Sequence, residues 1–196
     1  MRRLVVVEFL SLDGVYQAPG DPSEDTEGGF RHGGWQRPYF DEELGSAAAA
    51  GMAETDAQLF GRKTYRIMAA FWPNAPSDDP YAEHLNRVRK YVASSTMRDE
   101  DVTWHNTTLL KGDVVEAVRG IKQEPGGNIG VLGSGNLVRT LTKNDLVDEY
   151  SLAIYPIVLG SGKRLFGEDN EARRLELVDS KPTTTGGLLL TYRPAR

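Results

Sequence analysis

The 196-residue sequence contains no cysteine. This absence excludes disulfide bonds, thiol nucleophiles and zinc–thiolate sites, and it is typical of proteins of the reducing cytoplasm, where we expect this chain to work. The three histidines, His32, His84 and His105, do not have the spacing of metal ligands. We therefore expect no metal site.

Long apolar runs and an excess of basic residues are also lacking. No stretch approaches the roughly 18 consecutive apolar residues of a membrane-spanning helix, and Glu8 interrupts the apolar run that begins at Leu4. The 23 Lys and Arg residues are outnumbered by 28 Asp and Glu residues, giving a net charge of −5, and they are not clustered as in nucleic-acid-binding proteins. We therefore expect neither a membrane span nor a nucleic-acid partner.

Strands and helices alternate along the first two thirds of the chain. The patterns predict strands at 4–10, 58–61, 90–93, 102–105 and 129–132, and helices at 44–57, 62–71, 81–88, 113–123 and 136–142. A strand-rich end follows, with strands at 147–158, 175–178 and 184–192. This order predicts an α/β fold with a single domain over 1–196. The segment 20–34 is rich in glycine and acids, so we expect a mobile loop there.

The clearest chemical signal is the turn Gly133-Ser134-Gly135 between a strand and a helix. Glycines let the backbone approach a ligand, and the helix start offers unpaired N–H groups to an anion such as a dinucleotide pyrophosphate. The Rossmann fingerprint is not met, because Val138 stands where its third glycine belongs. The same turn also occurs for packing alone.

Two further turns follow predicted strands. Arg62 and Lys63 offer a planar fork and a point charge to phosphate oxygens, and Thr64 can cap the helix; alternatively, this is an exposed basic turn. Ser94 and Ser95 offer hydroxyls to a phosphate, or form an ordinary serine turn. Because ligands of open α/β sheets bind beyond the carboxyl ends of the strands, the three turns together predict one site.

These segments resemble the dihydrofolate reductase-like superfamily, and within it the C-terminal reductase domain of the riboflavin-biosynthesis deaminase-reductase and its stand-alone relatives. The resemblance covers nearly the whole chain from Ser11-Leu12-Asp13-Gly14 onward. It is carried by GRKTY at 61–65, Ser94-Ser95, VLGSGNL at 131–137, LVDEY at 146–150 and PIVLGSGKRLF at 156–166.

The resemblance implies a three-layer α/β/α fold with a mixed central sheet flanked by helices, NADPH as hydride donor, and a homodimer. It assigns the adenosine-side phosphates to Gly61, Arg62, Lys63 and Thr64, the 2′-phosphate to Ser94 and Ser95, and the pyrophosphate to Leu132, Gly133, Ser134, Gly135, Asn136 and Leu137. An arginine and hydroxyls at a 2′-phosphate favour NADPH over NADH, because the extra dianion needs charge-assisted bonds.

Hydride transfer needs positioning and, where the product requires it, a proton. Asp13, in the turn after the first strand, is the first candidate donor, because a half-buried carboxylate can have a raised pKa; alternatively it forms a plain Asp-Gly turn. Asp41 is the second candidate, because folate reductases carry an acid shortly after a tryptophan, here Trp35; alternatively it is a helix N-cap.

Aromatic residues near these acids are candidates for substrate stacking. Trp35, Tyr39 and Phe40 could form a wall against a flat heterocycle, and Tyr155 lies at a predicted strand end. Packing in the core is the alternative, which we favour for Phe40. The candidates for substrate binding are therefore Trp35, Tyr39 and Tyr155.

The segment after the first strand departs from the riboflavin-pathway reductases. Those enzymes carry a lysine near the Asp-Gly and residues that grip a ribose phosphate, whereas 15–19 reads VYQAP here and an acidic loop follows. A phosphoribosyl pyrimidine does not suit such a loop, and the zinc deaminase half is excluded by the lack of cysteine.

The sequence therefore predicts an NADPH-dependent reductase, of the 5-amino-6-(5-phosphoribosylamino)uracil reductase-like type, that acts on a small heterocyclic or carbonyl-like acceptor. Two alternatives remain. One is a dihydrofolate reductase, and the other is a dimeric NADP-binding protein that has lost catalysis.

Overall fold

The computed structural model describes residues 1–167 and 171–195, so residues 168–170 and 196 of the predicted single domain lie outside the described residues. In the described ranges the α-helices are α1 (Glu42–Glu54), α2 (Arg62–Phe71), α3 (Pro80–Arg87), α4 (Val114–Gln123) and α5 (Gly135–Lys143). The strands are β1 (Leu4–Ser11), β2 (Thr55–Gly61), β3 (Arg89–Ala93), β4 (Thr107–Leu110), β5 (Asn128–Leu132), β6 (Glu149–Tyr155), β7 (Leu175–Pro182) and β8 (Leu188–Pro194).

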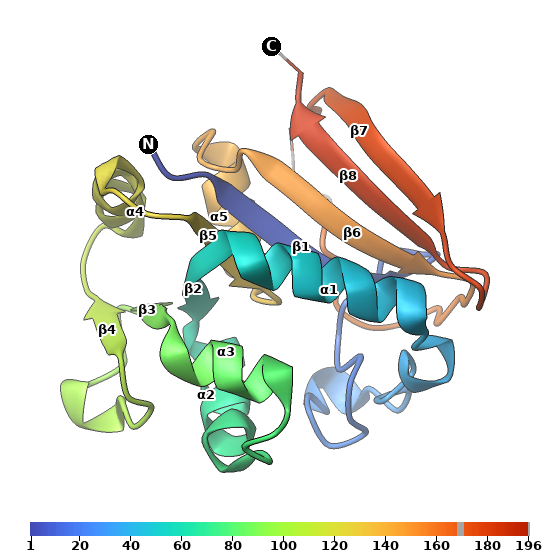
Figure 1. Cartoon of the computed structure of the whole chain (residues 1–196), viewed down its shortest axis with the longest axis horizontal. Coiled ribbons are helices and arrows are strands. Elements are labelled where there is room, and N and C mark those ends of the chain that lie inside the picture. The colour runs from blue at the N-terminus through green and yellow to red at the C-terminus, as the bar shows by residue number, and fades with distance from the viewer. Residues whose placement is uncertain (168–170, 196) are drawn as a thin grey trace.

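The described strands form one eight-stranded sheet in the order β4-β3-β2-β5-β1-β6-β8-β7 (Figure 1). Pairs from β4 to β6 are parallel, whereas β8 is antiparallel to both β6 and β7. The carboxyl ends of β2, β3 and β5 therefore lie side by side at one edge of the sheet. This is the mixed central sheet that the resemblance implied.

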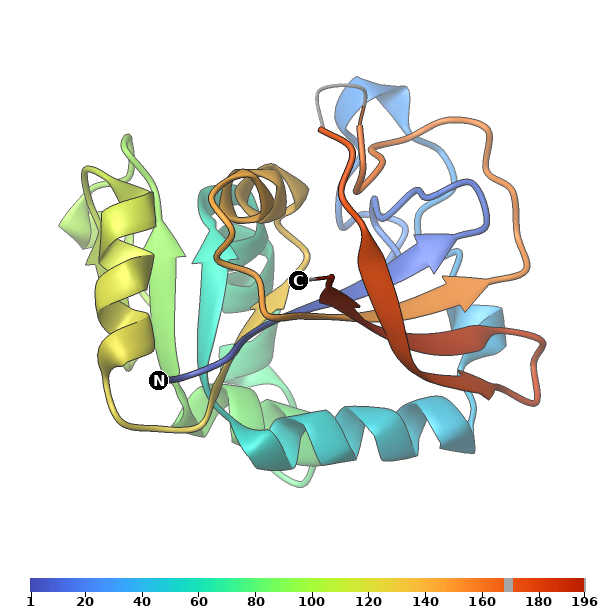
Figure 2. The ribbon, with the colours of Figure 1, turned by 90° about the horizontal axis from the view of Figure 1, so that it is seen from above.

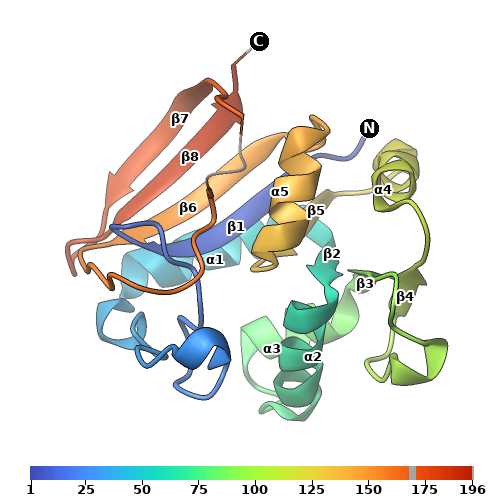
Figure 3. The ribbon, with the colours of Figure 1, turned by 180° about the vertical axis from the view of Figure 1, so that it is seen from behind.

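Helices cover both faces of the sheet. Figures 1 and 3 show α1 and α3 on one face and α5 on the other, and Figure 2 shows the strands between α1 and α5. Alternation along β1 explains the layers, because Leu4, Val6 and Leu10 pack with side chains of α4 and α5, whereas Phe9 packs towards Leu44 of α1. The predicted three-layer α/β/α fold is confirmed.

One predicted strand is wrong. Residues 102–105 lie outside the sheet, and the next strand is β4, which starts at Thr107. Trp104 explains the difference, because its side chain is buried against Phe60 and Tyr65 and its backbone N–H donates to Tyr65 Oη at 2.9 Å. A β-rich pattern therefore serves a packed loop here.

The first helix also ends earlier than predicted. The structure assigns residues 55–57, predicted as the end of the helix, to β2. Ala57 is fully buried and aligns with Arg89 of β3 and Ile129 of β5, so central-strand pairing overrides the helix propensity of alanine.

Candidate functional site

The three turns that follow β2, β3 and β5 meet at the carboxyl edge of the sheet. Gly61 donates its N–H to Ser134 Oγ at 2.9 Å, which joins the first turn to the third. Arg62 Nη1 donates to Thr96 Oγ1 at 2.6 Å, which joins the first turn to the segment that begins with Ser94 and Ser95. The structure thus brings the residues of the predicted cofactor site together.

The glycine turn has the shape that a close backbone approach requires. Gly133 has φ +60° and Ser134 has φ +65°, both in the left-handed region. A Cβ atom on Gly135 would lie 2.6 Å from the ring of Tyr16, so this position admits only glycine in the present arrangement. Leu132 and Leu137 are buried in the core, so only their backbone groups are available to a ligand.

The first turn of α5 already holds an oxygen atom. The N–H of Gly135 bonds to the phenol oxygen of Tyr16. Burial raises the pKa of Tyr16, the charge of Glu8 adds to this effect, and the bond from Gly135 opposes it. An oxygen atom therefore already lies at the N-terminus of α5, where an oxygen of a bound anion is expected.

Lys63 is bound by the acidic loop that we expected to be mobile. Its Nζ lies 2.7 Å from Asp25 Oδ1 and 2.5 Å from Glu27 Oε2, and Lys163 pairs with the same two carboxylates. Burial lowers the pKa of Lys63, but the hydrogen bonds with Asp25 and Glu27 raise it overall. Buried Gln17 fixes the loop further by donating to the carbonyls of Asp25 and Glu27 at 3.1 and 3.0 Å.

A cleft of about 530 Å³ lies between this loop and the start of α2. One wall carries the cations of Arg62, Lys63 and Arg66, and the other carries acids of the loop; the lining is Ser23, Glu24, Asp25, Thr26, Glu27, Arg62, Lys63, Arg66 and Ile67. The cationic wall is contiguous with the three turns because it shares Arg62 and Lys63 with them. The loop acids lie across from the groups that would hold phosphates.

Asp13 is part of a structural network. Its carboxylate accepts from Ser11 Oγ at 2.7 Å and from the amides of Leu159 and Gly160 at 3.0 Å each, and it pairs with Arg164 at 3.2 Å. Burial raises the pKa of Asp13, but these hydrogen bonds outweigh it and lower the pKa to about 2. The carboxylate is therefore ionised near neutral pH and is unsuited to the proton-donor role we expected.

Asp41 has the alternative role that the sequence offered. It is the N-cap of α1, accepting from the amide of Leu44 at 3.0 Å, and it also accepts from Thr184 Oγ1 at 3.0 Å and from Thr185. Burial raises the pKa of Asp41, and these bonds lower it to about 2. A capping carboxylate that stays ionised is likewise unsuited to donate a proton.

The aromatic candidates pack against each other. Tyr155, 1% exposed, has its ring centroid 5.8 Å from that of Trp35 and 5.6 Å from that of Tyr39. Trp35 Nε1 donates to the Gln17 carbonyl at 2.8 Å, and Gln36 donates to Tyr155 Oη at 3.0 Å. Trp35 and Tyr155 therefore belong to the core of this region, whereas Phe40, which we placed in the core, is 67% exposed.

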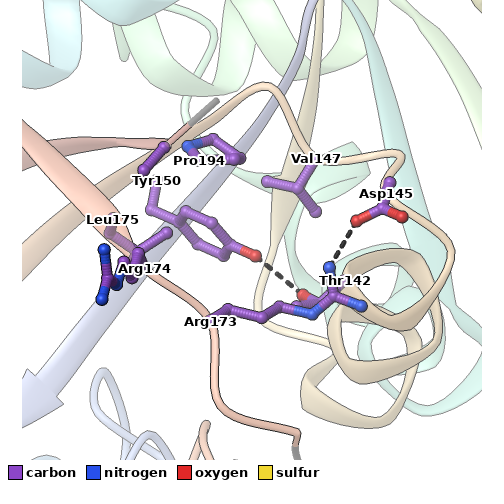
Figure 4. Close-up of a pocket in the computed structure, with 9 residues that line it drawn as sticks. Thr142, Asp145, Val147, Tyr150, Arg173, Arg174, Leu175 and Pro194 are labelled. Atoms are coloured by element: carbon purple, nitrogen blue, oxygen red, sulfur yellow. Dashed lines mark hydrogen bonds and ion pairs between the residues drawn. The ribbon is translucent and has the colours of Figure 1, made fainter.

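A smaller cavity of about 150 Å³ lies elsewhere, between the end of α5 and the strand-rich end (Figure 4). Its polar groups are largely paired, because Thr142 Oγ1 and Tyr150 Oη are 2.8 Å apart and Arg173 pairs with Asp145. None of its lining residues belongs to the three turns.

The sequence reasoning missed four residues of the site: Tyr16, Lys163 and the loop carboxylates Asp25 and Glu27. Lys163 lies in the GSGKRLF part of a segment that carries the family resemblance, so the sequence could have predicted its position near the site. Its pairing with Asp25 and Glu27 could not have been predicted, because these residues are more than 130 positions away in the sequence.

Among the described residues, no group of three or more His, Asp or Glu side chains could hold a metal ion. Likewise, no described helix has the length and apolarity to cross a bilayer.

Comparison with known proteins places this geometry in context. The chain is 29% identical over 144 residues to the uncharacterised protein YyaP of Bacillus subtilis, covering 71% of this chain and 74% of that protein. Its fold is similar to that of a candidate riboflavin biosynthesis protein of Shewanella sp. PV-4, with a TM-score of 0.71 at 23% identity over 99% of each chain. It is also similar to that of Enterococcus faecalis dihydrofolate reductase in complex with NADP(H), with a TM-score of 0.62 at 14% identity over 99% and 97% of the two chains.

The profile of one protein family extends over almost the entire sequence. It matches residues 2–189, which include all three turns and the acidic loop and end after the first two residues of β8. The chain therefore belongs to the RibD C-terminal domain family.

Proposed function

We propose that this chain is an NADPH-dependent reductase that transfers a hydride to a small heterocyclic or carbonyl-like acceptor. The observation that carries the proposal is the joining of Arg62 to the hydroxyl-bearing turn after β3, next to a glycine turn at the start of α5. A guanidinium with hydroxyls suits a 2′-phosphate, and a glycine turn at the start of a helix suits a pyrophosphate.

The residues fit such a coenzyme. Arg62, Ser94 and Ser95 would hold the 2′-phosphate, Lys63 and Thr64 the adenosine-side phosphates, and the turn from Gly133 to Asn136 the pyrophosphate. The bound coenzyme would supply the hydride. Oxygen atoms of Tyr16, Asp25 and Glu27 already contact two of these donor groups, which supports an oxyanion site there.

The acceptor is best matched by a molecule without a phosphate group. The loop beside the cleft contributes Glu24, Asp25 and Glu27, and like charges disfavour a phosphorylated substrate. Lys163 is paired with Asp25 and Glu27, so it is not free to bind a phosphate of the substrate. We therefore favour a neutral heterocycle or carbonyl compound over a phosphoribosyl pyrimidine.

Coenzyme titration followed by an oxidation screen tests the proposal. NADPH should quench tryptophan fluorescence at lower concentration than NADH, and NADPH oxidation should appear with one class among dihydropterins, aminopyrimidines and quinones. Turnover of dihydrofolate that antifolates inhibit would decide for a dihydrofolate reductase. Tight NADPH binding without turnover of any class would favour a binding protein, and failure to bind NADPH would refute the proposal.

A further inference from the structure

Glu8 is a carboxyl group buried within a central strand. It is 3% exposed, and its Oε1 atom is buried without a hydrogen-bond partner among the described residues. Burial raises the pKa of Glu8 well above its ordinary value, because no described charge compensates for the lost hydration. Burial therefore favours the protonated form of this carboxyl.

The position of Glu8 in the sheet places it beside the glycine turn. In the pairing of β1 with β5, Val7 aligns with Leu132, so Glu8 follows at the level of Gly133. Glu8 shares the face of Val6 and Leu10, which pack against α5. The chain leaves β1 through α1 towards β2 and leaves β5 through α5 towards β6, on opposite faces, so the crevice between β1 and β5 is the switch point where α/β sheets bind ligands.

Tyr16 links this carboxyl to the site. Its ring packs against the same core cluster, and Glu8 is close enough to influence its ionisation. Its phenol oxygen accepts from the Gly135 amide, which leaves the phenol proton available to a further acceptor. The charged groups that also act on Tyr16 are Arg139 of α5 and Asp25 of the acidic loop.

We propose that Glu8 stores the proton that the reduction consumes and that Tyr16 delivers it to the acceptor, an inference that rests on the proposed function. Reduction of a C=O or C=N acceptor takes a hydride from the nicotinamide coenzyme at carbon and a proton at oxygen or nitrogen. The Tyr16 O–H bond breaks as the new O–H or N–H bond forms, and the Glu8 proton restores the phenol. Glu8 remains as a carboxylate, which water reprotonates before the next turnover.

The two acids predicted from the sequence as proton donors do not supply this proton. Asp13 and Asp41 are both ionised and saturated with hydrogen bonds. Glu43 of α1 also has a buried oxygen without a described partner, but α1 lies on the other face of the sheet. Glu8 is the carboxyl that combines burial, a raised pKa and a place at the switch-point crevice.

The test uses the full chain with NADPH and two acceptors, 9,10-phenanthrenequinone and 7,8-dihydrofolate. Glu8→Gln and Tyr16→Phe should each lower kcat roughly 100-fold, as expected for loss of an acid–base group, and leave the Kd of NADPH within about threefold of wild type. Val6→Ala creates a cavity on the same face of β1 and is the control for structural damage. Its kcat should stay close to that of the wild type. The wild-type rate should fall as pH rises through a pKa above the ordinary carboxyl range, and Glu8→Gln should lose this dependence.

Infrared difference spectra provide a readout that does not need turnover. Wild type minus Glu8→Gln should show a protonated carboxyl band at pH 7, and that band should shift when NADPH binds. A carboxylate band at pH 7 would overturn the inference, as would unchanged kcat and pH profile in Glu8→Gln or loss of the pH dependence in Glu43→Gln. Failure of wild type to bind NADPH would instead refute the proposed function, so the two failures are distinguishable.

Discussion

At the scale of single residues, the proposed function assigns to Arg62 the selection of NADPH over NADH. Its guanidinium is exposed and bonds Thr96 at the end of the β3 turn, where a 2′-phosphate would be shared between a cation and hydroxyls. Arg62→Ala should weaken NADPH binding about 10- to 100-fold, because a hydrogen bond to a charged group contributes roughly 1.5–3 kcal/mol. NADH binding should change less than about threefold, measured by fluorescence titration of both coenzymes.

The control for this prediction is Arg119→Ala on α4. Arg119 is an exposed arginine of α4 that pairs with Glu116 and belongs to none of the three turns. It should leave both affinities unchanged. Equal weakening of NADPH and NADH by Arg62→Ala would remove the 2′-phosphate assignment.

Asp13 should control stability in acid. Its pKa is about 2 in the fold and 3.8 ordinarily, so its contribution is fully present above about pH 4 and is lost as pH falls towards 2. Asp13→Asn should lower the free energy of unfolding by about 1–3 kcal/mol at pH 7, since the charged acceptor of several hydrogen bonds is removed. Urea unfolding at pH 7 and at pH 2.5 measures the difference, which should shrink at the lower pH; a pH-independent difference would contradict the role of the charge.

At the scale of elements, the loop after β1 pairs with Lys63, the same lysine that would bind the proposed coenzyme. Asp25 and Glu27 form ion pairs with Lys63 and Lys163, so phosphate binding at Lys63 competes with them. The double variant Asp25→Asn with Glu27→Gln should tighten NADPH binding roughly two- to tenfold at low salt, because the two carboxylates then no longer compete for Lys63. Isothermal titration at low and high ionic strength measures this effect, which should diminish with salt.

A charge-matched control separates local competition from general electrostatics. Glu54→Gln with Glu124→Gln makes the same charge change at the ends of α1 and α4 and should leave NADPH affinity nearly unchanged. Weaker binding in the loop variant would mean that the two carboxylates help to hold the loop closed over bound coenzyme.

The elements show which parts of the structure could be predicted. The sequence predicted the turns after β2, β3 and β5 because each one is marked by glycine, hydroxyl-bearing or basic residues within a few consecutive positions. The strand predicted at 102–105 failed because Trp104 obtains its burial from Phe60 and Tyr65, which are distant in sequence. The low pKa of Asp13 and the lysine pairs of the acidic loop could not be predicted for the same reason. The pKa of Asp13 depends on the amides of residues 159 and 160, which are also distant in sequence.

Glu8 illustrates a signal that was present in the sequence and interpreted too narrowly. A single acid interrupts the apolar run that begins at Leu4, and the strand predicted over 4–10 is confirmed as β1. The same acid also indicates a chemical role. Burying a carboxyl in a central strand costs free energy, and carboxyls with such a cost are found mainly at functional sites. Only the register with β5 shows that it lies beside Gly133.

At the scale of the whole molecule, the sheet has two dissimilar ends. The parallel half carries the three turns, and the antiparallel end consists of β6, β8 and β7 (Figure 2). β7 is the last strand of the described sheet and is exposed along its length, with Leu177 55% and Val178 46% exposed. An exposed apolar edge strand is normally protected, and pairing with a second copy would protect it.

We therefore expect a homodimer that forms through the strand-rich end. Sedimentation at micromolar concentration should give twice the mass of one chain, and Leu177→Lys should shift the equilibrium towards monomer by placing a charge on the edge. Thr108→Lys makes the same charge change on β4, at the opposite edge of the sheet, and should leave the dimer intact. A wild-type monomer at these concentrations would contradict the prediction, and dissociation by Thr108→Lys alone would move the interface to the other edge.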